Sequence, residues 1–140
     1  MSGVEHENAR ALLAEGYTCA VYQDEKVYKS KKRGVVPLLE WLKSGENFQD
    51  FAAMDKVVGK AAAFLYLLLG VRSVYALVIS EEAERVLLSH GVAVEYADKV
   101  AAIRNRTNTG FCPMEQAVWE IEDENQAHAI ILQTLERLKS

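Results

Sequence analysis

Hydrophobic residues along the chain change between strand-like and helical spacing, and these changes predict the order of elements. Tyr17–Tyr22 and Lys26–Ser30 are rich in β-branched and aromatic residues, and the short polar segment between them predicts a hairpin. Terminal signals predict a helix on each side of this hairpin. The first helix is expected from Ser2 to Gly16, and the second over Val35–Ser44.

A continuous apolar segment, Ala61–Leu69, follows in the middle of the chain. A helix that is hydrophobic on every side is buried on every side, so this segment predicts a central helix. Asp55 is expected to be its N-cap and Gly70 to end it. The preceding segment, Glu46–Met54, is expected to be an irregular connection.

The next apolar run, Ser73–Ile79, is typical of a strand covered on both faces. Ser80 and the two acidic residues after it predict the start of a helix that ends at Gly91, and Val92–Tyr96 predicts another strand. Strand, helix and strand at this spacing predict a right-handed βαβ unit with parallel strands. We therefore expect residues 1–140 to form one α/β domain, a three-layer α-β-α arrangement with a mixed sheet.

The last third of the chain is expected to be helical apart from one loop. Asp98–Arg104 is expected to form a short helix, and Pro113 predicts the start of another that runs to about Ile121. A final helix, capped by Asp123 and extending to near Lys139, has apolar positions at helical spacing. This last helix should therefore pack on the domain.

Composition limits the class of protein. The net charge of −4 disfavours a nucleic-acid-coating protein, because such domains are strongly basic. The polar, acidic start and the short apolar runs argue against a secretory signal and a membrane span. Two cysteines give no disulfide framework, and free thiols suit a reducing compartment. We therefore expect a cytoplasmic protein without a membrane partner. The sequence does not indicate which oligomeric state it adopts.

The segment from Asp55 to Lys60 is the first candidate site. In the expected helix, Lys56 and Lys60 are four residues apart and share one face at an N-terminus, where free N–H groups favour anions. Gly59 would leave room for a ligand to approach closely. The segment therefore predicts a phosphate or carboxylate clamp. The alternative is that both lysines are solvated and Gly59 serves close helix packing.

The segment from Asn105 to Glu115 is the second candidate site. Cys112 precedes a proline that starts a helix, and Cys is a poor N-cap, which suggests that the residue serves another purpose. The helix N-terminus and the guanidinium groups of Arg104 and Arg106 favour a thiolate, which could be a nucleophile, a sulfur carrier or a redox-sensitive group. The alternative is a buried structural thiol. Glu115 is expected to reach back to the Cys112 N–H as half of a capping box.

These two segments are expected to share one pocket, because ligands of open α/β sheets bind where strand carboxyl ends meet helix N-termini. Lys56, Lys60 and Arg106 are predicted to form a cationic cluster around the two candidate catalytic residues, Asp55 and Cys112. The other predicted ligand-binding residues border the same place: Gly59, Asn105 and Glu115.

The predicted order of hairpin, buried helix and strand–helix–strand resembles the core of the cytidine-deaminase-like fold. The strings Asp55–Ala63 and Asn105–Glu115 resemble one branch of it, a bacterial and archaeal family described only as domain of unknown function 1893. The likeness extends from about Tyr17 to Asp123. It implies a cytidine-deaminase-like fold, with a site at the start of the buried helix.

The sequence departs from zinc deaminases at their metal motifs. Those enzymes carry His-x-Glu or Cys-x-Glu at the start of the buried helix and Pro-Cys-x-x-Cys at the next helix. Asp55–Lys60 and Ser80–Glu84 stand in those places here, without a His or Cys in either. We therefore expect no metal ligands, no zinc and no cofactor.

Three functions stay open at this point. The pocket could bind an anionic small molecule without a metal, such as a nucleotide or another phosphate ester. The chain could instead be a Cys112-dependent thiol enzyme or sulfur carrier. It could also be a non-catalytic interaction module that uses the basic run Lys29–Arg33 or the outer helices. We expect that run to be a solvated strand end, and the acidic composition disfavours a nucleic-acid partner.

Overall fold

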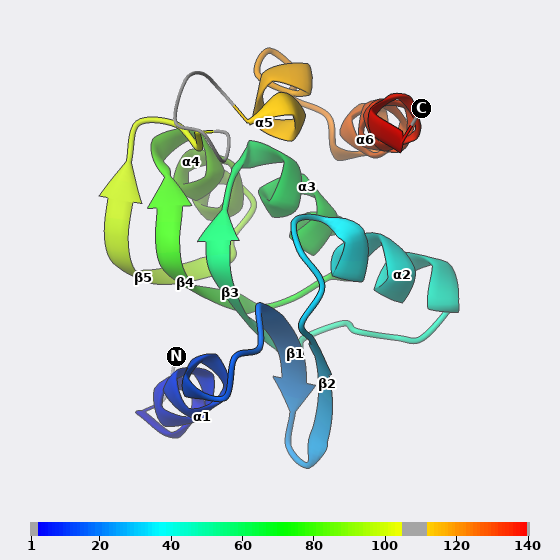
Figure 1. The fold of residues 1–140 in the computed structure, drawn as a ribbon. Coiled ribbons are helices and arrows are strands. Elements are labelled where there is room, and N and C mark those ends of the chain that lie inside the picture. The colour runs from blue at the N-terminus through cyan, green and yellow to red at the C-terminus, as the bar shows by residue number, and fades with distance from the viewer. Residues whose placement is uncertain (1–2, 105–111, 140) are drawn as a thin grey trace.

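The computed structural model describes residues 3–104 and 112–139, and these residues form a mixed sheet of five strands with helices around it. The strands stand in the order β2-β1-β3-β4-β5 across the sheet (Figure 1). Their bounds are β1 Cys19–Gln23, β2 Lys26–Ser30, β3 Ala52–Val58, β4 Ser73–Ser80 and β5 Ala93–Val100. β1 is antiparallel to β2 and β3, whereas β3, β4 and β5 run parallel, so strand direction changes between β1 and β3.

Helices cover both faces of this sheet. Their bounds are α1 Gly3–Ala14, α2 Val36–Ser44, α3 Lys60–Leu69, α4 Glu81–Ser89, α5 Pro113–Ala117 and α6 Glu124–Lys139. α1 lies on one face, α3 and α4 lie on the other, and α2 and α6 contact α3 (Figure 1). The α/β class and the three-layer arrangement predicted from the sequence are therefore confirmed.

Several predicted elements are found close to their expected bounds. The hairpin of β1 and β2 turns at Asp24, whose φ of 53° is a conformation that Asp tolerates. The apolar strand, the helix capped by Ser80 and the following parallel strand are β4, α4 and β5. Asp123 caps α6, because its Oδ2 accepts the N–H of Gln126 at 2.9 Å.

The prediction for the segment before the central helix is wrong. Ala52–Val58 is not the end of an irregular connection and the start of a helix; it is strand β3, paired with β1 on one side and β4 on the other. Asp55 is therefore a strand residue, and Gly59 is the N-cap of α3. Ala, Asp and Lys have weak strand propensity, so the pairing partners rather than the local sequence decide this strand.

The expected helical pairing of the two lysines is wrong for the same reason. Lys56 lies on β3 with an exposed side chain, whereas Lys60 starts α3 and is completely buried. The ammonium of Lys60 donates to the carbonyl of Trp119 and to a carboxylate oxygen of Glu122, each at 2.7 Å. This lysine therefore ties the start of the central helix to the segment between α5 and α6.

The two elements predicted between residues 98 and 121 also differ. Asp98–Arg104 is not a helix, because β5 continues to Val100 beside β4. α5 ends at Ala117 and is shorter than the expected helix to Ile121. The parallel ladder with β4 extends β5 beyond the apolar residues that indicated it.

Glu115 does not form the predicted capping box with Cys112. The N–H of Cys112 donates to the carbonyl of Ile103 instead, at 2.9 Å. Glu115 is 2% exposed, and its carboxylate accepts the backbone N–H of Lys60 at 2.7 Å and the hydroxyl of Ser80 at 3.2 Å. One side chain of α5 therefore joins the N-termini of α3 and α4, where helix dipoles favour a negative charge.

Gly59 is required by this carboxylate. Its φ of −94° is open to any residue, but a Cβ placed there would lie 2.1 Å from Oε2 of Glu115 and 3.0 Å from Ile103. The geometry therefore supports the alternative in which Gly59 allows close packing, and the group that packs against it is the Glu115 side chain.

We predict that Gly59→Ala destabilises the fold by about 1–3 kcal/mol, because the displaced Glu115 carboxylate loses buried hydrogen bonds. Urea denaturation of the single variants Gly59→Ala and Glu115→Ala and of the double variant measures the coupling. The second substitution should cost little once the first is present, and penalties that simply add would contradict the assignment.

Candidate functional site

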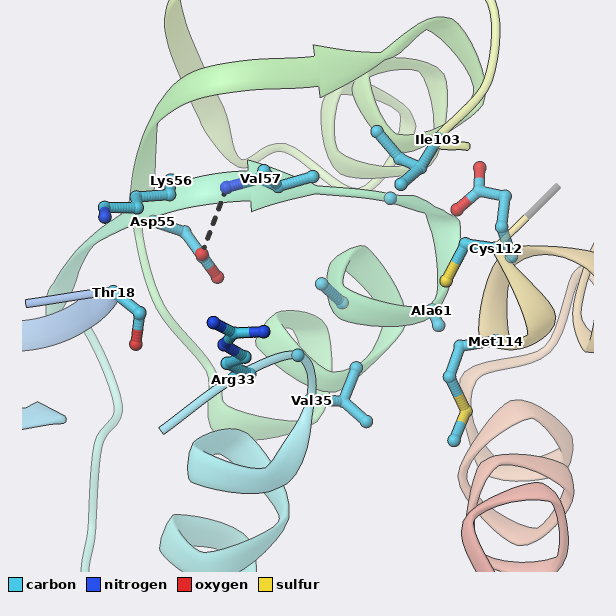
Figure 2. Close-up of a pocket in the computed structure, with 14 residues that line it drawn as sticks. Thr18, Arg33, Val35, Asp55, Lys56, Val57, Ala61, Ile103, Cys112 and Met114 are labelled. Carbon is cyan, nitrogen blue, oxygen red and sulfur yellow. Dashed lines mark hydrogen bonds between the residues drawn. The ribbon is translucent and has the colours of Figure 1, made fainter. Parts of the chain in front are cut away.

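A cavity of about 320 Å³ opens where the carboxyl end of β3 meets the start of α3. Strand β1, the loop before α2, and α5 supply the other walls (Figure 2). Most of the wall is apolar: Val35, Val57, Ala61, Ala62, Ile103 and Met114. The polar side chains are Thr18, Arg33, Asp55, Lys56, Cys112 and Glu115. The cavity therefore suits a ligand with both apolar and polar parts.

Asp55 lies in the cavity wall because β3 turns this residue toward α3. Its side chain is 7% exposed, Tyr66 of α3 donates its hydroxyl to Oδ2 at 2.8 Å, and the N–H of Val57 donates to Oδ1 at 3.3 Å. Cys19 of β1 stands opposite in the strand register and is buried too. The carboxyl group is thus fixed by two donors while it still faces the cavity.

Burial raises the pKa of Asp55 to about 7, although the hydrogen bonds from Tyr66 and from the backbone oppose that shift. Burial also raises the pKa of Tyr66, and the neighbouring Asp55 adds to this effect. Near neutral pH the Asp55 carboxyl can therefore both release and take up a proton, as a general acid or base requires.

Two cations border the same end of the cavity. The guanidinium of Arg33 points toward Asp55 from the loop before α2, and Lys56 lies next to Asp55 on β3 (Figure 2). Both residues are exposed, and neither forms an ion pair with another of the described residues. Their charges are therefore open to a ligand.

The opposite end of the cavity carries sulfur and the second acid. Cys112 and Met114, from the start of α5, lie there with Ile103 (Figure 2). Glu115 faces this end with a pKa raised by burial, an effect that hydrogen bonds from Lys60 and Ser80 reduce. The cavity is thus charged near Asp55 and mostly apolar near Cys112.

The structure brings most of the predicted site residues together. Five of them line the cavity: Asp55, Lys56, Gly59, Cys112 and Glu115. Lys60 does not, because its ammonium is buried against Glu122. The predicted residues Asn105 and Arg106 lie outside the described residues.

Sequence reasoning missed the roles of Arg33, Thr18 and Tyr66. Arg33 belongs to a basic run that was expected to be a solvated strand end. The hydroxyl of Tyr66 is the one polar side-chain group in the apolar segment Ala61–Leu69, and it was the available signal for a buried acid beside it.

Within residues 3–104 and 112–139, no group of three or more His, Cys, Asp or Glu side chains could hold a metal ion. Over the same ranges, no helix has the length and apolar character needed to cross a membrane.

We predict that Asp55 makes stability fall as the pH rises. The unfolded carboxyl loses its proton near pH 3.8 and the folded one near pH 7, so between these values the folded state binds more protons and the free energy of unfolding decreases with pH. Asp55→Asn should lack this component. Denaturation of both proteins at pH 4, 5, 6 and 7 gives the difference.

Tyr66→Phe provides the matched test of this prediction. Loss of the hydroxyl donor to Asp55 should raise the pKa of the carboxyl further, so the decrease in stability should extend to higher pH. Identical pH profiles for the wild type and Asp55→Asn would show that Asp55 does not titrate in this range.

Comparisons with known proteins agree on one family. The sequence matches the family described as "Domain of unknown function (DUF1893)" over residues 8–135. The crystal structure of a DUF1893 family protein from Thermotoga maritima is similar, with a TM-score of 0.87 and 25% identity, over 95% of this chain and 90% of that chain. No curated protein matches the chain. With the family matched over most of its length and the same fold found in a solved member, this chain belongs to the DUF1893 family.

Proposed function

We propose that the cavity binds an anionic small molecule, such as a nucleotide or another phosphate ester. Arg33 and Lys56 hold its anionic group, and the apolar walls formed by residues such as Ala61 and Met114 receive its body. The observation that carries the proposal is the pair of cations that lack ion-pair partners among the described residues and border one end of a mostly apolar cavity.

The anion is held away from the helix N-terminus that the sequence pointed to. The N–H of Lys60, in the first turn of α3, already donates to the Glu115 carboxylate. A second negative group there would meet that carboxylate at close range. Arg33 and Lys56, at the other end of the cavity, offer charge without this repulsion.

Asp55 gives the cavity a group that can act on the bound molecule. Its pKa of about 7 lets it donate a hydrogen bond when protonated and accept a proton when ionised. In this proposal Asp55 is the acid–base residue, and Tyr66 is a positioning residue that holds it. A metal-free mechanism and the likeness to the cytidine-deaminase-like fold remain parts of the proposal.

A second candidate function uses the thiol. Cys112 lines the same cavity as Asp55 and is partly exposed. A thiolate at this place would attack an acyl carbon of a molecule held by Arg33 and Lys56, and the leaving group would depart with the electron pair of its bond to that carbon, giving a thioester. The chain would then be a thiol-dependent enzyme; the sulfur-carrier alternative would use the same thiol. Measurement of the alkylation rate of Cys112 against pH tests it. An inert thiol would rule this candidate out.

We predict that a phosphate ester raises the melting temperature of the protein by several degrees when present in large excess over its dissociation constant. AMP, CMP and glucose 6-phosphate are suitable probes for a thermal-shift measurement. Arg33→Ala and Lys56→Ala should each weaken binding about tenfold or more, because each removes a charge-assisted contact.

Lys43→Ala is the matched control for these two variants. Lys43 is an exposed lysine of α2, the helix that follows the Arg33 loop, and it is not among the residues that line the cavity. Its replacement should leave the thermal shift unchanged. Equal loss of binding in all three variants would indicate general charge attraction and contradict the assigned site.

A further inference from the structure

Two lysines of the basic run lie over a single aromatic ring. The ammonium of Lys29 is 4.6 Å from the centroid of the Tyr17 ring, and that of Lys31 is 5.0 Å from it. Both distances are in the cation–π range. Neither lysine forms an ion pair with another part of the chain that the structure describes. We call Tyr17, Lys29 and Lys31 the Tyr17 patch.

The Tyr17 patch lies on the face of the sheet that α1 covers, and it adjoins the cavity at Thr18. The N–H of Thr18 donates to the carbonyl of Ser30 at 2.9 Å, and its hydroxyl donates to the carbonyl of Lys32 at 2.5 Å, so Lys31 lies directly beside it. On the other side, the N–H of Lys56 donates to the carbonyl of Thr18 at 2.9 Å. Thr18 lines the cavity, so one residue joins the patch to the cavity and its cations.

Most cations of this region have no ion-pair partner among residues 3–104 and 112–139. Lys32 shows the contrast, because its ammonium pairs with Glu40 at 2.6 Å. Its neighbours Lys31 and Arg33 form no such pair among the described residues. Positive charges that gather without ion-pair partners in the described part of the chain, which has a net charge of −4 overall, make a local field that attracts anions.

We infer that the ligand carries a chain of phosphates, as in a nucleoside di- or triphosphate, which begins at Arg33 and Lys56 and passes Thr18 to reach the Tyr17 patch. This inference rests on the proposed function of the cavity. Tyr17 packs on the face of the sheet that α1 covers, whereas Arg33 points toward Asp55 on the face that α3 covers. A single phosphate cannot contact both Arg33 and the two lysines of the Tyr17 patch, whereas a phosphate chain that passes Thr18 can.

The Tyr17 patch adjoins a cavity of small-molecule size, and this favours a small polyphosphate as the ligand. A nucleic-acid strand would need cations along an extended surface. Here Arg33 and Lys56 border a cavity of about 320 Å³, and Lys29 and Lys31 lie over Tyr17, the residue before Thr18 of its wall. The cavity receives the body of one small molecule, and the patch receives what extends from it.

The experiment measures dissociation constants by calorimetry for AMP, ADP and ATP, and for phosphate, pyrophosphate and tripolyphosphate. In the wild type each added phosphate should strengthen binding several-fold, with a salt dependence that grows along each series. The variant Lys29→Gln/Lys31→Gln should bind ATP at least tenfold more weakly and AMP within twofold of the wild type. Gln keeps most of the side-chain length beside Tyr17, and both lysines are exposed, so the fold should be retained.

Lys26→Gln is the matched control, because it removes an exposed lysine from the opposite end of the same strand. Lys26 precedes Lys29 by three positions, which is roughly 10 Å along the strand, and precedes Lys31 by five positions. It should leave every constant in both series unchanged. The salt dependence of ATP binding by the wild type is a second measurement that needs no variant.

The outcomes separate this inference from the proposed function. Equal affinities for AMP, ADP and ATP would overturn the phosphate chain and leave anion binding in the cavity intact. Failure of every probe to bind would overturn both. Binding of single-stranded oligonucleotides that is tighter than that of ATP, and unaffected by Arg33→Ala, would overturn the inference by making the Tyr17 patch a nucleic-acid surface.

Discussion

The buried carboxylate of Glu115 is the constraint on which the arrangement of this molecule depends. It occupies the place where the first turns of α3 and α4 converge, accepting one donor from each. An acid enclosed at 2% exposure is costly unless its oxygens are hydrogen-bonded, and here both are. Because Glu115 belongs to α5, the same contact closes one end of the cavity and positions Cys112 and Met114 in its wall.

The charged groups in and near the cavity differ in burial and in pairing. Burial raises the pKa of the Asp55 carboxyl, whereas Arg33 and Lys56 are exposed at the opening of the cavity. Outside the cavity, the buried ammonium of Lys60 is neutralised by Glu122, whose pKa is lowered to about 2 by Arg85 and Lys60. Lys60 and Lys56 therefore differ in their roles. Lys60 joins the start of α3 to the segment between α5 and α6, whereas Lys56 is exposed and available to a ligand.

Sequence patterns predicted the elements whose signals are local. The hairpin, β4, α4 and α6 have alternation, capping residues or helical spacing that identify them without knowledge of their neighbours. β3 has none of these, because it is stabilised by ladders with β1 and β4. Missing that strand placed Asp55 and Lys56 on a helix, and the expected cluster with Lys60 followed from this error.

The candidate site shows the same division between local and distant causes. Cys112 and Gly59 could be singled out because a proline and an apolar helix lie beside them. The partner of Gly59 could not be, because it depends on a glutamate 56 positions later in the chain. Arg33 lines the cavity because β2, which precedes it, pairs with β1. The composition of the basic run could not predict which way its side chains point.

The contacts of Lys60 have a consequence for how the chain matures during synthesis. Its backbone and its ammonium find their partners 55 and 62 residues later, at Glu115 and Glu122. Such distant contacts form late, since loop closure must precede them. A growing chain that has left the ribosome only as far as β5 therefore holds its central helix with the leading turn open to water. The contacts with Glu115 and Glu122 close that turn late in folding, and the contact with Glu115 also completes the wall of the cavity.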